Sequence, residues 1–430
     1  MIGKDHFLDK EACSHNESYL LLINSIEVLF IFVSFLCLFA CSEKQQKMDG
    51  YPVIDVEKSV VAKKYSVKRL SDYVQKIVYI PLETNDSSLV QYNDRIILEN
   101  GRLFVNDNNN NCLSFDEKDG RFLGTIGKKG QGPDEFVIIR GMDISRDGKR
   151  ILISSTNRGI EYSIDGEFVR SIKLPEVEGC MPYRMAYLQD NLFLHSLVSW
   201  KTSEYEYCVA TDSGIVKLLQ KEYQPVIKDN DLGFAFSEMT EIYRVGNDLH
   251  AYRKQSDTIY TILGEGDRVP SYVLNLGKYR SSFKQDEQYE EQSARKNIFV
   301  TDYSESSRHS FFKFSFGDYA PEPFEETIYN RVGEKRTLVN AFVYGIYTKS
   351  TGDMALLNQP SPGKLGLWND LDGGPVFWPQ YISKEGKMAM LIDAEEFIEV
   401  CGSIKNPSTE IKKVLDRLEL EDNPVLVVAY

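Results

Sequence analysis

The chain has 430 residues, of which 42% are hydrophobic and 27% are charged, so it contains ample apolar material for a globular core. Its formal net charge is −14. Residues 1–41 hold two Lys and five Asp/Glu and contribute −3, which leaves −11 on the remainder. An acidic surface argues against nucleic acid and anionic lipid headgroups as partners. The 25 Tyr and 23 Phe favour strands.

An apolar run at 26–40 (IEVLFIFVSFLCLFA) is the first feature along the chain. It is short for a membrane span, which needs about 20 residues, and it fits the apolar core of a signal peptide. The run ends in Leu38-Phe39-Ala40-Cys41, which resembles a bacterial lipobox, whose cysteine is lipidated and becomes the new N-terminus. We therefore predict a lipoprotein signal peptide over 1–41 and lipidation at Cys41. An uncleaved anchor and a plain secretory signal are the alternatives.

A polar stretch follows at 42–49 (SEKQQKMD), with the composition of a tether between a lipid and a folded domain. We assign 42–50 to this flexible tether and 51–430 to the folded domain. The segment 76–82 (KIVYIPL) is predicted to be a strand, but no neighbouring segment can pair with it.

A repeated unit begins at 94. Between 94 and 126, three turn signals separate short runs rich in Ile, Leu, Val and Phe: Asn100-Gly101, the NDNNNN cluster at 106–111, and Asp119-Gly120. Asn-Gly and Asp-Gly supply the positive φ angles that tight hairpins need. Four antiparallel strands are therefore predicted, near 94–98, 102–106, 111–116 and 121–126.

Residues 140–173 repeat this order. Asp147-Gly148 follows the Asn-Gly turn by 47 residues, and Asp165-Gly166 follows the first Asp-Gly turn by 46. Four strands in a period of 40–50 residues predict the blades of a β-propeller. The segment GKKGQGPDEF at 127–136 is too rich in Gly and Pro for a regular element, and we interpret it as the crossover between two blades.

Less regular units follow. The third unit has predicted strands near 183–188, 191–197, 205–210 and 214–220. The fourth has predicted strands near 241–245, 248–253, 257–263 and 269–276. A partly helical insertion near 278–335 opens the fifth unit, with strands near 298–303, 309–316, 339–348 and 353–358. The sixth unit has strands near 376–383 and 386–392.

The end of the chain completes the ring. Helical patterns at 393–401 and 408–418 precede a last strand at 424–430. A closed ring leaves no exposed sheet edge between blades, so we expect the strands 76–82 and 424–430 to pair in one blade. The predicted fold is all-β: a six-bladed β-propeller of four-stranded antiparallel blades, closed by strands from both ends of the chain.

Several of these segments together resemble a known family. A strand ending in Phe-Asp, an Asp-Gly turn, a strand and then G-x-x-G-x-G-P-x-E-F is similar to an NHL-type repeat. The segments 255–262 (QSDTIYTI), 366–379 (GLWNDLDGGPVFWP) and 421–428 (EDNPVLVV) resemble six-bladed propeller lipoproteins of Bacteroidetes. With the lipobox, this resemblance implies a lipid-anchored monomer of the cell envelope, on the outer membrane, facing the periplasm or the cell surface.

The sequence offers few residues for metal or nucleophilic chemistry. His195, His250 and His309 lie in three predicted blades and match no metal-ligand spacing, so locally packed histidines are favoured and neither a metal nor a cofactor is expected. The cysteines form no C-x-x-C pair, and buried free thiols are favoured over a disulfide framework. The 106–111 cluster has one acid, Asp107, which favours a solvated turn over a calcium loop.

The run Asn369-Asp370-Leu371-Asp372-Gly373-Gly374-Pro375 is the strongest candidate for a ligand site. Two carboxylates and an amide lie on a tight turn flanked by Trp368, Phe377 and Trp378, and aromatic rings beside hydrogen-bonding acids are a common carbohydrate-binding combination. The candidate ligand-binding residues are Trp368, Asn369, Asp370, Asp372 and Trp378. In the alternative, the turn caps its own backbone and the tryptophans pack between blades. The 278–335 insertion is a second candidate, as a lid.

Two functions remain open at this point. A binding or scaffold module of the envelope, for a glycan or a partner protein, is favoured because no catalytic set is recognisable. The alternative is a hydrolase or lyase that acts on glycans or lactones at the central channel, with acids and histidines from different blades. A propeller fold hosts both kinds of protein, so the fold cannot decide between them.

Overall fold

The computed structural model describes residues 47–48, 50–91, 93–107, 109–199, 204–221, 239–253, 256–280, 295–329 and 335–430. The described residues belong to one compact unit, 47–430. The predicted signal peptide and most of the predicted tether, including Cys41, lie outside the described residues.

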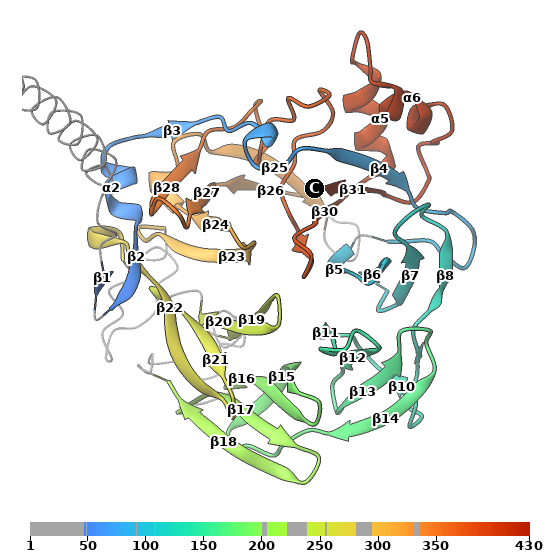
Figure 1. The fold of residues 1–430 in the computed structure, drawn as a ribbon, viewed down its shortest axis with the longest axis vertical. Coiled ribbons are helices and arrows are strands. Elements are labelled where there is room, and N and C mark those ends of the chain that lie inside the picture. The colour runs from blue at the N-terminus through green and yellow to red at the C-terminus, as the bar shows by residue number, and fades with distance from the viewer. Residues whose placement is uncertain are drawn as a thin grey trace, which may run out of the picture. The chain divides into compact units, whose positions relative to one another are not determined.

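Six small, mainly antiparallel sheets form a ring, in chain order (Figure 1). The predicted six-bladed β-propeller is confirmed. The first three blades are β5(Asn93–Glu99)–β6(Arg102–Asp107)–β7(Cys112–Asp116)–β8(Phe122–Thr125), β11(Gly141–Ile144)–β12(Arg150–Ser154)–β13(Arg158–Ser163)–β14(Phe168–Lys173), and β15(Cys180–Gln189)–β16(Leu192–Ser199)–β17(Tyr205–Thr211)–β18(Gly214–Gln220).

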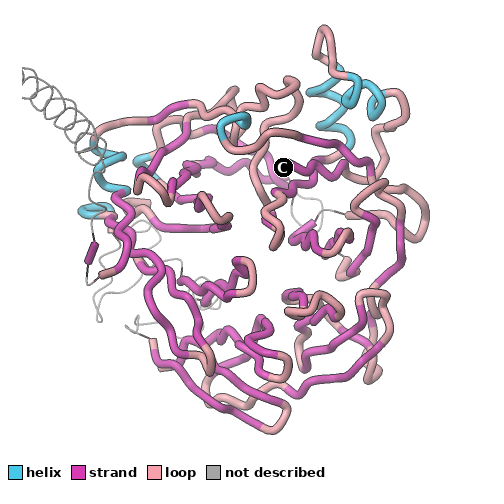
Figure 2. Tube along the Cα trace, in the orientation of Figure 1, coloured by secondary structure: helices cyan, strands magenta, loops and turns pink. Residues whose placement is uncertain are grey.

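The other three blades carry additions. They are built on β19(Thr240–Val245)–β20(Asp248–Arg253)–β21(Thr258–Leu263)–β22(Asp267–Asn275), β23(Phe299–Glu305)–β24(His309–Ser315)–β27(Phe342–Thr348)–β28(Asp353–Leu357), and β29(Tyr381–Ile382)–β30(Met388–Ile392)–β31(Val425–Ala429)–β4(Ile77–Pro81). Strands make up most of the ring (Figure 2).

Both ends of the domain meet in the sixth blade, as predicted. The C-terminal β31 lies between β30 and β4 and pairs antiparallel with each, from Val425 opposite Pro81 to Ala429 opposite Ile77. A strand from residues 77–81 therefore supplies the outer strand of a blade whose other strands come from the last 50 residues of the chain.

The tight turns form for the reason their sequences suggest. Asn100 and Gly101 both have positive φ (53° and 76°), as do Gly120, Gly148 and Gly166 at the other predicted hairpins. Turns of adjacent blades also touch: the Asn100 side chain donates to the Gly148 carbonyl at 3.0 Å.

Three elements differ from the sequence predictions. The segment 47–66 adds outer strands: β1(Lys47–Met48) and β2(Tyr51–Asp55) extend the fourth blade, and β3(Tyr65–Ser66) extends the fifth. A hairpin, β25(Phe324–Tyr329) and β26(Lys335–Asn340), occupies the end of the predicted partly helical insertion, and the strand predicted over 339–348 begins only at Phe342, as β27. The strand predicted over 376–383 shrinks to two residues, Tyr381 and Ile382, because Pro379 within it cannot donate a ladder hydrogen bond.

Apolar clusters lie between adjacent blades and hold the ring together. One joins the sixth blade to the first through Ile80, Ile96 and Leu426, and equivalent clusters lie at the other junctions. Helices α5(Ala394–Gly402) and α6(Thr409–Leu415) connect β30 to β31 and bury Phe397, Cys401 and Ile411 in the cluster of the fifth and sixth blades. The four cysteines of the described segments form no disulfide bond and are buried or half-buried. None of the described helices is long and apolar enough to cross a membrane.

Strand direction gives the ring two different faces. Hairpin turns between the first and second strands, and between the third and fourth, lie on one side, which we call the turn face. Connections between blades and loops between second and third strands leave from the other side, the crossover face. The β25–β26 hairpin and the α5–α6 pair both leave from strand ends on the crossover face.

Candidate functional site

The central channel holds the polar cavity that draws on the most blades. The inner strands β5, β11, β15, β19 and β23 surround the middle of the ring (Figure 1), and with Gln380–Ile382 of the sixth blade they line a cavity of about 460 Å³. Because each inner strand belongs to a different blade, ring closure brings together residues that lie far apart in the sequence.

Two arginines share one carboxylate near the crossover face. Arg95 of β5 lies 3.3 Å from Oε2 of Glu241 on β19, and Arg184 of β15 contacts the same oxygen. The Arg184 and Glu241 side chains are 17% and 10% exposed, whereas Arg95 is 35% exposed toward the channel. Burial, and then the nearby Arg95 charge, lower the pKa of Arg184 to about 9. The group therefore carries one more positive charge than negative.

A second polar group lies on the fifth blade. Lys313 of β24 is paired in register with Asp302 of β23 and with Tyr344 of β27, so the three side chains share one face of the sheet. The Lys313 ammonium lies 4.2 Å from the centre of the Phe342 ring, and burial lowers its pKa. Asp302 accepts a hydrogen bond from the Tyr243 hydroxyl at 2.8 Å.

Tyr243 connects the two groups. It lies two residues after Glu241 on β19, so both side chains lie on the same side of that strand.

Toward the turn face, Arg244 binds Asp143 through two hydrogen bonds of 2.8 and 2.5 Å, and both side chains are under 10% exposed. This bidentate pair neutralises the deeper part of the channel.

A buried group of hydrogen-bonding side chains borders the channel between the fourth and fifth blades. Glu305 lines the cavity. Its Oε1 accepts a hydrogen bond from Tyr272 and forms an ion pair with Lys349, and its Oε2 lies 3.6 Å from Nδ1 of His250. The His250 Nε2 lies 3.1 Å from the Thr261 hydroxyl. Burial lowers the pKa of His250, which opposes the effect of Glu305.

The predicted 369–375 turn lies away from this channel, against the outer strand of the sixth blade. Asn369 is fully buried and donates to the Tyr79 hydroxyl and to Asp372, each at 2.9 Å. Asp372 also accepts hydrogen bonds from Tyr79 and from the Gly374 amide. Asp370 accepts from the Ser71 amide and hydroxyl. The turn thus uses much of its hydrogen-bonding capacity within the protein.

The two tryptophans of that prediction have different environments. Trp368 is 48% exposed, and its backbone pairs with the segment 68–70. Trp378 is half-buried, with its ring 4.3 Å from that of Tyr344 and 5.5 Å from that of Phe311. The structure brings Asn369, Asp370 and Asp372 together on one turn, while Trp378 packs between the fifth and sixth blades.

The three histidines are not brought together. His195 is buried in β16, and His309 packs edge-on against Tyr73 at 5.0 Å. Within the described segments, no group of three or more His, Cys, Asp or Glu residues is placed to hold a metal ion. In the 106–111 loop, Asp107 accepts hydrogen bonds from the Asn111 amide and side chain. Much of the helix-compatible part of the 278–335 insertion lies outside the described residues.

A family model decides where the chain belongs. Residues 51–430 match a domain of unknown function, DUF4934. The chain belongs to the DUF4934 family.

Solved structures share the fold of this DUF4934 domain. A candidate exported protein of Bacteroides fragilis aligns with a TM-score of 0.60 and 18% identity, over 88% of this chain and 99% of that one. A member of the DUF4221 family from Bacteroides vulgatus aligns with a TM-score of 0.48 and 11% identity, over 83% and 96%. No curated protein matches the chain. Identities this low show similarity of fold alone.

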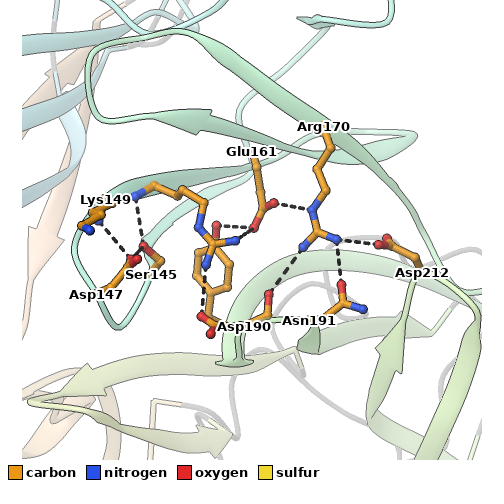
Figure 3. Close-up of polar contacts among 10 residues, drawn as sticks. Ser145, Asp147, Lys149, Glu161, Arg170, Asp190, Asn191 and Asp212 are labelled. Atoms are coloured by element: carbon orange, nitrogen blue, oxygen red, sulfur yellow. Dashed lines mark hydrogen bonds and ion pairs between the residues drawn. The ribbon is translucent and has the colours of Figure 1, made fainter.

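A polar network elsewhere in the DUF4934 domain is structural in character. The fully buried Glu161 of β13 binds Arg150, Arg170 and the Tyr187 hydroxyl, and Arg170 continues to Asn191 and Asp212 of the third blade (Figure 3). The apolar cluster at this junction of the second and third blades has only five buried residues. We conclude that the network supplies cohesion that the small cluster does not.

The channel residues of the DUF4934 domain escaped the sequence predictions. Arg95 and Glu241 are 146 residues apart, and Arg184 and Glu241 are 57 apart. No motif links them. The one feature that could have indicated them is their position, because a charged residue within a predicted inner strand lies near the axis of a propeller.

Proposed function

We propose that this protein is a lipid-anchored cell-envelope protein whose propeller is a binding module, with a polar ligand such as a glycan or a segment of a partner protein held in the central channel. The observation that carries this proposal is the 460 Å³ cavity to which all six blades contribute. Guanidinium, ammonium and tyrosine hydroxyl groups line it, and these groups recognise oxygen-rich ligands.

Binding is favoured over hydrolysis because most acids of the channel have charged partners. Glu241 is held by two arginines, Asp143 by Arg244, and Glu305 by Lys349. Glycoside hydrolysis ordinarily needs two carboxyl groups, one of them protonated at neutral pH and the other available as a base or nucleophile. Asp302 is the one exposed acid of these channel groups, and it accepts a hydrogen bond from the Tyr243 hydroxyl.

The envelope location rests on two observations of different kinds. The segment 26–41 resembles a lipoprotein signal ending at Cys41. A protein of the same fold from Bacteroides fragilis is named as a candidate exported protein. Both support export, and the lipobox-like segment alone supports retention at the membrane through a lipid.

A lyase or hydrolase is the second candidate, and the group around His250 favours it. His250, Tyr303 and Glu305 lie together beside the channel, with Nδ1 of His250 3.4 Å from the Tyr303 hydroxyl. Histidine and tyrosine are suited to proton transfer. All three have little exposed surface. Tyr303 and Glu305 border the cavity, whereas a substrate would reach His250 only through a rearrangement.

Filling the channel tests the proposed function. Ser304 lines the cavity and is half-buried, so Ser304→Trp places an indole in it. We expect this variant to lose at least tenfold in affinity for a glycan identified on an array, because the bulky ring excludes the ligand. Ser213→Trp, on the exposed β17–β18 turn, is the matched control and should bind normally.

Three other outcomes would change the assignment. Equal glycan binding by the Ser304→Trp variant and the wild type would refute the channel as the binding site. Loss of binding in Trp368→Ala and Asp370→Ala, but not in Ser304→Trp, would place the glycan at the 369–375 turn instead. Release of a smaller sugar product by the wild type, abolished in His250→Gln, would establish the enzyme.

A further inference from the structure

We infer that the ligand of the channel is an anion, and that Arg95 and Arg184 hold its carboxylate or phosphate group. This inference rests on the proposed function, because it names the chemistry of the ligand in the same channel. Four observations carry it: the local charge balance, the burial of the charged groups, a second cation whose ammonium forms no ion pair within 4 Å among the described residues, and the position of the hydroxyl groups between the two cationic centres.

The charge balance near the crossover face is positive. Arg95 and Arg184 contact a single oxygen of Glu241, so two cations share one anion. Two guanidiniums around one carboxylate leave one positive charge in excess at this group.

Burial makes this excess costly in the unliganded protein. The Arg184 side chain is 17% exposed, and the positive charge of the neighbouring Arg95 acts on it. The lowered pKa of Arg184 reflects both the desolvation and this repulsion. An anion that binds between the two guanidiniums would supply the missing negative charge, and charge-assisted, bidentate hydrogen bonds to arginine are strong.

Lys313 provides a second cationic centre in the same cavity. Among the described residues its ammonium forms neither a hydrogen bond nor an ion pair within 4 Å. The ammonium rests on the Phe342 ring, with the Asp302 and Glu326 carboxylates farther away. An ammonium with three unused donors, partly removed from water, is a ready site for an acceptor on a ligand.

Tyrosine hydroxyls lie between the two cationic centres. Tyr243 follows Glu241 on the same side of β19, and its oxygen lies 3.2 Å from the Tyr252 hydroxyl and 2.8 Å from Asp302. A ligand that spans from Arg95 to Lys313 therefore meets the Tyr243 hydroxyl, and it passes the exposed Asp302 carboxylate, which lies opposite Lys313. An acidic or phosphorylated sugar has this distribution of charge and hydroxyl groups, whereas a neutral sugar leaves the guanidiniums uncompensated.

The net charge of the protein makes the site selective. The chain carries −11 outside residues 1–41, so an anion is repelled at long range and is held only where the arginines converge. Salt screens interactions over about 8 Å at physiological ionic strength. We therefore expect affinity to depend on the arginines rather than on general electrostatic attraction.

Three sugars with the same ring test the inference. Binding of glucuronate, glucose 6-phosphate and glucose to the purified full chain would be measured by calorimetry at low salt. We expect the two anionic sugars to bind at least tenfold more tightly than glucose. Whichever of them binds more tightly identifies the group as a carboxylate or a phosphate.

Charge variants separate the inference from general effects. Arg95→Gln should weaken binding of the preferred anion about tenfold, and Glu241→Gln should strengthen it because it removes the competing carboxylate. Arg121→Gln, an exposed change of the same kind outside the channel, should leave the affinity unchanged. Thermal unfolding of each variant confirms that the fold persists.

Two results would overturn the inference, and they are distinguishable. Glucose binding as tight as that of the anions, unaffected by Arg95→Gln but lost in Ser304→Trp, would refute an anionic ligand and leave the proposed function intact. If neither anion bound at millimolar concentration, while an array glycan bound equally to wild type and Ser304→Trp, both the inference and the channel site would fail.

Discussion

His195 shows how far the environment of one residue departs from what its type suggests. It lies on β16 opposite Met185 and Cys208, 1% exposed, and its Nδ1 has no hydrogen-bond partner among the described residues. Burial lowers its pKa to about 3. The imidazole is therefore neutral in the folded protein across the physiological range, and its role is packing.

This burial predicts a stability that depends on pH. In the unfolded chain His195 takes up a proton below about pH 6.5, whereas the folded protein does so only near pH 3, so stability falls as the pH falls between these values. Each pH unit is worth about 1.4 kcal/mol. Between pH 7.5 and 5, the wild type should thus lose about 2 kcal/mol more unfolding free energy than His195→Gln.

Urea unfolding at the two pH values measures this difference. The comparison with the variant removes the contributions of His250 and His309, whose pKa values burial also lowers. Equal losses in wild type and variant would show that His195 is protonated in the folded state.

At the scale of elements, the turns were predictable and the channel was not. Asn100-Gly101 forms a hairpin because positive φ is a local property of those two residues, and the same holds for Gly148 and Gly166. The Arg95–Glu241 contact depends on strands from the first and fourth blades meeting across the ring. No local preference encodes such a contact, so a single sequence cannot reveal it.

The errors in the strand predictions have similar causes. The β25–β26 hairpin was missed because 324–340 is largely polar, with exposed strands that lack an alternating apolar face. The 369–375 turn was predicted to be a ligand site because acids, glycines and tryptophans are adjacent in sequence. In the structure its acids bind Tyr79 and Ser71, residues almost 300 positions away.

The closing strand gives a prediction at this scale. β31 lies between β30 and β4, so deleting 425–430 removes both its ladders and separates the two ends of the ring. We expect the truncated chain to lose its cooperative thermal transition and to expand in small-angle scattering. Deleting 47–55, which removes only the two added outer strands of the fourth blade, β1 and β2, should lower the unfolding temperature by a few degrees at most. A compact 1–424 chain would refute closure by β31.

At the scale of the whole molecule, the two faces of the ring differ in what they carry. The turn face consists of short hairpins, whereas the crossover face carries the β25–β26 hairpin and the α5–α6 pair. The Arg95 and Glu241 side chains also lie where the inner strands begin, close to the crossover face. Inserted segments and the cationic end of the channel thus share one side, and we expect the ligand to enter there.

The attachment of the propeller to the membrane is the last prediction. The short polar segment 42–46 separates Cys41 from β1, so a lipid on Cys41 would hold the domain close to the bilayer. Cys41→Ser should therefore move the protein from the detergent phase to the aqueous phase in a Triton X-114 partition, because a serine cannot carry the thioether lipid. Cys37→Ser makes the same chemical change four residues earlier and should leave the protein in the detergent phase. Retention of the Cys41→Ser protein in the detergent phase would instead indicate an uncleaved anchor over 26–40, whereas aqueous partitioning of the wild type would indicate a plain secretory signal.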